Sequence, residues 1–161
     1  MIDNIIQLGK KNTLVFRIAD ENGVETGETL EFDLEDIELP LRYQELLEQN
    51  KKNKQWMENQ INIISKRQDV KGKKLYSKNE EDIMKATIEF FKKEEEVYDM
   101  FLGKDGVKKL LNGKKLGWSS FSEIDEIISK YIMPKLDEHK INIADNIKKK
   151  YNVEENDNVL E

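Results

Sequence analysis

The chain has 161 residues, of which 37% are hydrophobic and 37% are charged, with a formal net charge of −6 and no cysteine. This length suits one domain with tails, and the lack of cysteine excludes disulfides, zinc–thiolate sites and thiol nucleophiles. No stretch approaches the roughly 18 consecutive apolar residues of a membrane span, and the N-terminal sequence is too short and too acidic for a signal peptide. We therefore expect a cytoplasmic protein without a membrane partner.

The charges are unevenly distributed along the chain. Residues 1–50 carry 12 acidic and 4 basic residues, residues 51–118 carry 11 and 17, and residues 119–161 carry 10 and 6. This acid–base–acid order allows the chain to fold back on itself or to dock a charged partner. The simpler alternative is that these charges only solvate exposed helix faces.

We predict one α+β domain, mainly α-helical, over residues 12–151. An N-terminal arm over residues 1–11 precedes it, and a polar tail over residues 152–161, which we expect to be disordered, follows it. Within the domain, we expect an antiparallel β-hairpin over residues 12–35 and a helical body over residues 36–151. The hairpin should pack on a bundle of about four to five helices.

Two segments near the N-terminus alternate between apolar and polar residues. "TLVFRIA" (residues 13–19) places Leu14, Phe16 and Ile18 on one face, and "ETLEFDL" (residues 28–34) has the same period. The sequence "DENG" between them is a turn signal, so the pattern predicts an antiparallel hairpin with one apolar face. A lone hairpin is marginal in water, and we therefore expect this face to lie on the helices.

The first helix is predicted to begin near Pro40, which is tolerated in a first helical turn, and to run to about Arg67. Its apolar stripe is interrupted in the middle by the polar sequence "QNKKNKQ". Two readings remain open at this point. Either the helix is continuous and solvated there, or it breaks near Asn50–Asn53.

The second helix is predicted from a capping box, in which Ser77 and Glu80 hold the spacing S-x-x-E. Gly103 is suited to end it. Its apolar stripe is wide, which is typical of a central helix with two neighbours, and we expect Phe90, Val97 and Phe101 to be buried.

Two further helices follow. A short one is predicted from about Asp105 to Asn112, and another is predicted to open with a second capping box formed by Ser120 and Glu123.

Pro134 interrupts the last helical pattern. Proline removes a backbone hydrogen bond within a helix and kinks it, so we expect a bend near residues 131–134 and helix resuming to about His139. Asn142 is suited to cap one more short helix.

The sequence offers no constellation of catalytic or metal-binding residues. His139 is the single histidine, with no second histidine or cysteine to complete a transition-metal site. We expect a non-enzymatic protein without a cofactor.

The segment from Lys51 to Lys78 contains nine basic residues and Trp56, and nucleic-acid binders combine basic grooves with stacking aromatic residues. However, the rest of the chain is acidic and would repel phosphate. Nucleic-acid association is therefore an alternative that we do not favour.

The order of these elements resembles that of the tail assembly chaperones, small proteins of tailed phages that infect Gram-positive bacteria. "FDLEDIELPLRYQELLEQ" matches a strand that runs into a helix, "MFLGKDGVKKLLNG" a short helix in a glycine-bounded segment, and "LGWSSFSEIDEIISKY" a helix opened by an aromatic-containing segment. The resemblance covers roughly residues 12–142 and rests on element order and a few apolar positions.

This resemblance implies a binding function in the cytoplasm of the host cell, without a cofactor or catalytic residue. Such chaperones coat the long tape-measure protein and help to recruit tail-tube subunits during assembly. Two alternatives stay open: a phage-encoded regulatory or inhibitory protein that binds a host factor, and a nucleic-acid-associated protein that uses the basic segment. A homo-oligomer is also compatible with the sequence.

A partner of this kind is long, helical and apolar, and amphipathic helices are usually received by apolar grooves. The apolar residues that the sequence leaves most available for such a contact are Trp56, Met57, Trp118 and Phe121. The alternative for these four residues is ordinary core packing.

Overall fold

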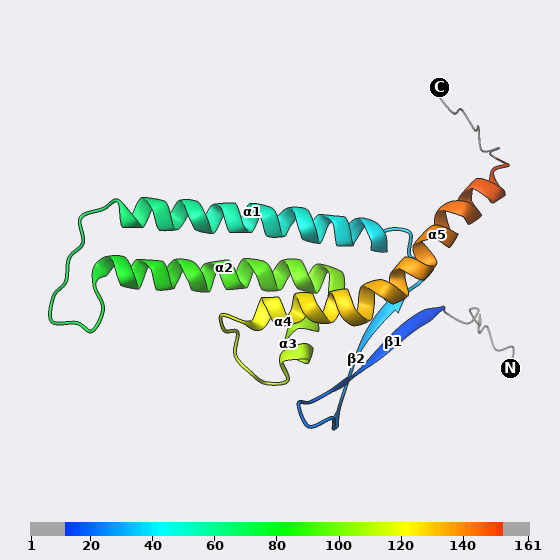
Figure 1. Ribbon diagram of the computed structural model, residues 1–161, viewed down its shortest axis with the longest axis horizontal. Coiled ribbons are helices and arrows are strands. Elements are labelled where there is room, and N and C mark those ends of the chain that lie inside the picture. Colours follow the sequence, from blue (N-terminus) through cyan, green and yellow to red (C-terminus); the bar gives the residue numbers. More distant parts are fainter. Residues whose placement is uncertain (1–11, 153–161) are drawn as a thin grey trace, which may run out of the picture.

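Figure 1 shows the computed structural model of the chain, which describes residues 12–152 and, among these, all side chains except those of residues 139–143. The predicted N-terminal arm, the side chain of His139 and the predicted tail beyond Asn152 lie outside the described residues. Within residues 12–152, no helix combines the length and the apolar content needed to cross a bilayer.

The fold is α+β and mainly α-helical, as predicted. A two-stranded antiparallel sheet is followed by helices that cover most of the remaining chain (Figure 1). The elements are β1 (Thr13–Ala19), β2 (Glu25–Asp33), α1 (Leu39–Ser65), α2 (Lys78–Leu102), α3 (Gly106–Leu111), α4 (Ser120–Ile127), the π-helical turn η1 (Ile128–Ile132) and α5 (Met133–Lys150).

The β-hairpin has the predicted apolar face. Leu14 is opposite Phe32, and Phe16 is opposite Leu30, so the apolar residues of both strands lie on one side of the ribbon. Asp20 closes the turn, because its Oδ1 accepts hydrogen bonds from two backbone N–H groups, 2.9 Å from the nitrogen of Asn22 and 2.9 Å from that of Val24. The buried side chains of this face then contact the helices.

The acid-rich link between β2 and α1 is held by its own side chains. Asp33 Oδ1 accepts a hydrogen bond from the backbone N–H of Glu35, and Asp36 Oδ1 accepts one from that of Glu38. Arg42, one turn into α1, forms ion pairs with Asp36 and Glu38, and its hydrogen bond lowers the pKa of Asp36. The link thus stabilises the turn from strand to helix.

Helix α1 is continuous through Asn50–Asn53, which decides between the two readings of its polar interruption. Helix α2 begins with the predicted capping box: Ser77 Oγ accepts from the backbone N–H of Glu80, and the Glu80 side chain accepts from that of Ser77. Gly103 ends α2 with a φ of 95°, a conformation that favours glycine.

The predicted capping box at Ser120 is wrong. Helix α4 begins at Ser120 itself, and its N-cap residue Ser119 forms no side-chain cap hydrogen bond. The Ser120 hydroxyl instead accepts from the backbone N–H of Gly117 at 2.8 Å, so it fixes the preceding turn. Ser120 is therefore the first residue of the helix rather than its N-cap.

The prediction of two separate helices after Pro134 is also wrong, because α5 is continuous to Lys150. The proline is accommodated by η1, in which the N–H of Met133 bonds to the carbonyl of Ile128, five residues back. Proline has no N–H to donate, and it is tolerated in a first helical turn. Pro134 lies in the first turn of α5, directly after this π-helical turn.

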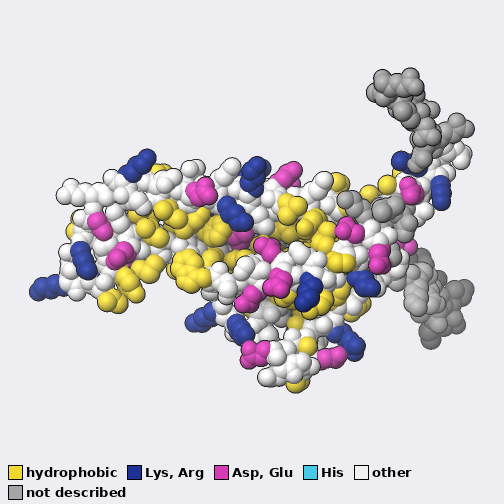
Figure 2. Space-filling model, in the orientation of Figure 1, with side chains coloured by type: hydrophobic (Ala, Val, Ile, Leu, Met, Phe, Trp, Pro, Cys, Tyr) yellow, Lys and Arg dark blue, Asp and Glu magenta, His cyan; other side chains and the backbone are white. Residues whose placement is uncertain are grey.

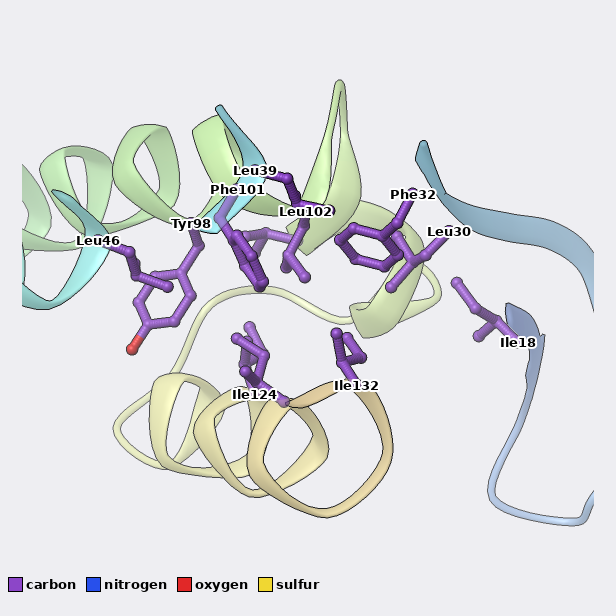
Figure 3. Close-up of a cluster of buried hydrophobic side chains, with 12 residues drawn as sticks. Ile18, Leu30, Phe32, Leu39, Leu46, Tyr98, Phe101, Leu102, Ile124 and Ile132 are labelled. Carbon is purple, nitrogen blue, oxygen red and sulfur yellow. The ribbon is translucent and has the colours of Figure 1, made fainter. Parts of the chain in front are cut away.

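The main hydrophobic core lies at one end of the α1–α2 pair, where the hairpin, α3, α4 and η1 meet it (Figures 1 and 3). Phe101 is at its centre, with ring centroids 5.6 Å from Phe32 and 5.3 Å from Tyr43. Of the three α2 residues predicted to be buried, Phe101 is buried, whereas Phe90 and Val97 are half-buried. The buried members of this core are Ile18, Leu30, Phe32, Leu39, Leu46, Tyr98, Phe101, Leu102, Val107, Ile124, Ile128 and Ile132.

Candidate partner-binding site

The α1–α2 pair extends beyond the main core. The core draws on α1 only up to Leu46 and on α2 only from Val97 onwards. Further out, Ile64 and Ala86 are buried without belonging to that core. Figure 1 shows that α4 runs beside the half of α2 nearest the core and leaves the other half of the α1–α2 pair without a third helix.

An apolar strip lies on the uncovered part of α2. Met84, Ile88 and Phe91 are spaced i, i+4, i+7, which places them on one face of the helix. Trp118, just before α4, packs edge-on against Phe91 with 5.9 Å between ring centroids, and its side chain is 83% exposed. We call Met84, Ile88, Phe91 and Trp118 the apolar strip. Figure 2 shows hydrophobic side chains gathered over this part of the molecule.

Phe121 connects the apolar strip to the core. Its ring lies 5.7 Å from that of Phe91 and stacks at 5.3 Å on that of Tyr98. Phe121 is half-buried, and Tyr98 is buried. The structure therefore brings two of the four predicted partner residues, Trp118 and Phe121, together around Phe91.

Trp56 lies elsewhere. Its ring is covered by Lys93, whose Nζ is 4.8 Å from the ring centroid. Lys93 and Phe91 are two positions apart on α2, so their side chains point about 200° apart around the helix. Because Trp56 contacts Lys93 and Trp118 contacts Phe91, the two tryptophans lie at opposite edges of the α1–α2 pair. Met57 is half-buried on α1. The four predicted residues do not form one surface, and Lys93 lies over one face of the Trp56 ring.

A buried polar layer crosses the helices where the main core ends. The Glu94 side chain is 2% exposed and accepts from Asn53 Nδ2 at 2.9 Å. Asn50 lies 3.2 Å from the Tyr98 hydroxyl, which donates to Asp125 of α4. Within the described residues, every buried side-chain nitrogen and oxygen has a hydrogen-bond partner. The polar interruption of α1 thus pairs with polar groups of α2.

Burial sets the electrostatics of this layer. It raises the pKa of Glu94, against the opposing effects of the Asn53 hydrogen bond and the nearby Lys54 charge. Burial also raises the pKa of Tyr98, and the hydrogen bond to Asp125 adds to this shift. The Glu94 carboxyl group is therefore easier to protonate than an exposed one.

The Asn50 amide contacts both buried groups of this layer. Its Nδ2 lies 3.0 Å from Glu94 Oε2 and donates to the carboxyl group, and its Oδ1 lies 3.2 Å from the Tyr98 hydroxyl. The same carboxyl group accepts from Asn53 Nδ2, so two asparagines of α1 hydrogen-bond to Glu94.

A groove of about 540 Å³ opens between α1 and α4–η1 beside the polar layer. Its walls combine apolar groups, such as Leu47 and Ile128, with Lys51, Lys54 and Asp125. Sequence reasoning did not find this groove or the polar layer. The signal that could have found the layer is the "QNKKNKQ" interruption, because asparagines in the middle of an apolar stripe need polar partners.

Among the described side chains, no group of three or more His, Asp or Glu residues is placed to hold a metal ion. The basic residues between Lys51 and Lys78 do not form one continuous surface. Lys51 and Lys54 border the groove, whereas the basic residues from Lys66 to Lys74 lie in the loop at the far end of α1, and Lys78 begins α2.

Comparison of the chain with known protein families, with curated proteins and with solved structures finds no match.

Proposed function

We propose that this chain is a non-enzymatic assembly chaperone or adaptor of a phage tail, which binds the tape-measure protein and tail-tube subunits during assembly. The apolar strip carries the proposal, because large exposed apolar surfaces are typical of protein-binding sites. Trp118 stands at its inner end with 83% of its side chain exposed. The resemblance in element order supplies the identity of the partner.

The strip suits a helical partner. Near the core, α4 contacts this side of α2, with Phe121 against Phe91 and Tyr98. The strip continues along the same helix beyond the start of α4, so an amphipathic helix can lie there and complete a three-helix arrangement. A tape-measure protein offers such a helix before the tail tube encloses it.

The size of the strip indicates that one copy binds weakly. Met84, Ile88 and Trp118 are 38%, 56% and 83% exposed, and fully burying a large apolar side chain contributes about 1.5–3 kcal/mol. Covering the three therefore contributes about 3–5 kcal/mol, whereas a dissociation constant of 1 μM needs about 8 kcal/mol. A long partner that binds several copies gains the rest through avidity.

The proposal requires a tape-measure protein encoded beside this chain, and coexpression of the two tests it. The wild-type chain should keep that protein in the soluble fraction, and the double variant Ile88→Ser, Trp118→Ser should not. Ile63→Ser is the matched control. Ile63 is also exposed, but it lies seven residues after Trp56 on the same face of α1, at the opposite edge from the strip.

The control should behave as the wild type does, and circular dichroism of the free proteins should be the same for all three. If the tape-measure protein stays insoluble with the wild-type chain, the chaperone function is wrong. If Ile63→Ser and the strip variant fail equally, the site is wrong.

A further inference from the structure

The loop between α1 and α2, residues 66–77, combines positive charge with exposed apolar side chains. It has five basic residues and one acidic residue, Asp69. Leu75 is 81% exposed and Val70 is 67% exposed. We call residues 66–77 the basic loop.

Part of this charge is compensated within the chain. Arg67 forms an ion pair with Asp82, and Lys74 forms one with Glu81. Lys66, Lys71 and Lys73 have no ion pair within residues 12–152. These three cations and the exposed apolar residues are available to a partner.

The opposite end of α1 has the complementary character. Residues 31–38 contain five acidic residues and no basic residue, and we call them the acidic edge. Arg42 pairs with Asp36 and Glu38. Glu31, Asp33 and Glu35 have no ion pair within the part of the chain that the structure describes.

Apolar side chains are exposed at this end as well. Ile37 and Leu41 are 60% and 61% exposed, beside the acidic edge. Two cations of the described residues, Arg17 and Lys109, are engaged elsewhere: Arg17 pairs with Glu25, and Lys109 Nζ donates to the carbonyl of Thr29. Among residues 12–152, both ends therefore combine charges that form no ion pair, of opposite sign at the two ends, with exposed apolar groups.

These two surfaces cannot meet within one molecule. The 27 residues of α1 separate them, which corresponds to about 40 Å at 1.5 Å per residue. The Debye length at physiological ionic strength is about 8 Å, so the charge at one end of α1 does not neutralise the charge at the other. Along α1, the acid–base–acid order of the sequence thus places opposite charges at opposite ends of the helix.

We propose that the basic loop of one copy docks on the acidic edge of a second copy. The contact is head-to-tail, because the two surfaces differ, and head-to-tail contacts build open chains or closed rings rather than isolated dimers. Ion pairs between exposed groups are weak and are screened by salt. Association is therefore expected at low salt and high protein concentration. This surface is separate from the apolar strip, and the inference does not depend on the proposed function.

Sedimentation velocity of the full chain over a range of concentrations, in 50 mM and 500 mM salt, tests the contact. Wild-type protein should form larger species at low salt and be monomeric at high salt. The loop swap Lys71→Glu, Lys73→Glu and the edge swap Glu31→Lys, Glu35→Lys should each lower the association constant at least tenfold. Lys52→Glu, Lys92→Glu changes the net charge as the loop swap does, at exposed positions along the helices, and should leave association unchanged.

Combining the two charge swaps tests whether the loop and the edge contact each other directly. An equimolar mixture of the loop swap and the edge swap restores opposite charges at each contact, and so does a chain that carries both swaps. Both should associate again, as the wild type does. A wild-type chain that is monomeric at low salt overturns the proposal. A doubly swapped chain that folds, by circular dichroism, but stays monomeric also overturns it.

Discussion

The side chains of the buried polar layer define how α1 and α2 pair. Asn53 reaches Glu94, and Asn50 reaches Tyr98, so shifting one helix along the other by a turn would leave buried polar groups without partners. Such groups cost about 1–3 kcal/mol each when they are unsatisfied. Apolar side chains alone tolerate shifts of register more readily, and a single buried asparagine can fix register in coiled coils. We infer that this layer specifies the register of the long helical pair.

The first prediction concerns the charge of Glu94. Because burial raises its folded-state pKa, the contribution of this group to stability is greatest below its ordinary pKa of 4.5 and falls as the pH rises through the folded value. Glu94→Gln cannot ionise and keeps hydrogen bonds to Asn50 and Asn53. We expect it to raise the free energy of unfolding at pH 7 by about 1 kcal/mol or more, as measured by urea denaturation.

Urea denaturation of both proteins at several pH values isolates the effect of the Glu94 charge. The stability difference between Glu94→Gln and the wild type should grow from pH 4 to pH 8, although other carboxyl groups with lowered pKa values, such as Asp36, make both proteins less stable in acid. Glu96→Gln, at an exposed position two residues along α2, is the control and should show no such trend. A lower urea midpoint for Glu94→Gln at pH 7 would mean that the fold needs the carboxylate.

Short sequence motifs predicted helices and strands correctly where the contacts that they require lie within the same element. The period of residues 13–19 predicted β1, and the Ser77 capping box predicted the start of α2. Ser120 carries the same motif, but its hydroxyl accepts from the backbone N–H of Gly117 in the turn that leads into α4. The motif alone does not tell these two cases apart. The π-helical turn before Pro134 similarly depends on how η1 packs on the core.

The second prediction compares two phenylalanines of α2. Phe101 is 3% exposed and touches rings of β2 and α1, so Phe101→Ala should lower the free energy of unfolding by about 3–5 kcal/mol. Phe90 is half-buried outside the main core, and Phe90→Ala should cost less. Urea midpoints measure both. Equal losses would show that the outer half of the α1–α2 pair is as tightly packed as the core.

The third prediction concerns the junction of α2 and α3. A Cβ atom at Gly106 would lie 2.5 Å from the Cβ of Leu102, which is buried, and the adjacent Val107 N–H is held by Asp99 Oδ1 at 2.9 Å. Gly106→Ala should therefore cost about 1–3 kcal/mol through overpacking. Gly72→Ala, with no atom within 4 Å of its added Cβ, is the control and should leave the urea midpoint unchanged or slightly higher. If both variants retain wild-type stability, α3 is not packed tightly against α2.

At the scale of the whole molecule, the sequence predicted the class of fold but not its asymmetry. The wide apolar stripe after Ser77 predicted a central helix with two neighbours. The structure instead places the main core at one end and leaves the apolar strip and the basic loop at the other (Figures 1 and 2). Which half of α2 receives a third helix depends on where α4 packs, and this long-range contact has no local signal. Of the four residues that the sequence singled out for partner binding, Trp118 lies in the apolar strip and Phe121 contacts it through Phe91.

The last prediction follows from this asymmetry. No member of the main core lies within residues 54–93, so replacing that segment by a short Gly/Ser turn should leave the core intact. The replacement joins Asn53 to Glu94, which are already 2.9 Å apart through their side chains, and helix–helix connections of about 2–8 residues are common. The shortened chain should unfold cooperatively in urea, with a smaller m-value because it exposes less surface.

The shortened chain should lose both of its proposed binding properties. The deletion removes Met84, Ile88 and Phe91 of the apolar strip and the whole basic loop. Under the two proposals made above, the shortened chain should therefore neither keep a tape-measure protein soluble nor self-associate at low salt. Circular dichroism and urea denaturation establish that it is folded before either property is measured. If it does not fold, the outer half of the α1–α2 pair is needed for the core. If it folds and still binds the tape-measure protein, the partner site lies at the core end, and the groove between α1 and α4–η1 becomes the surface to mutate.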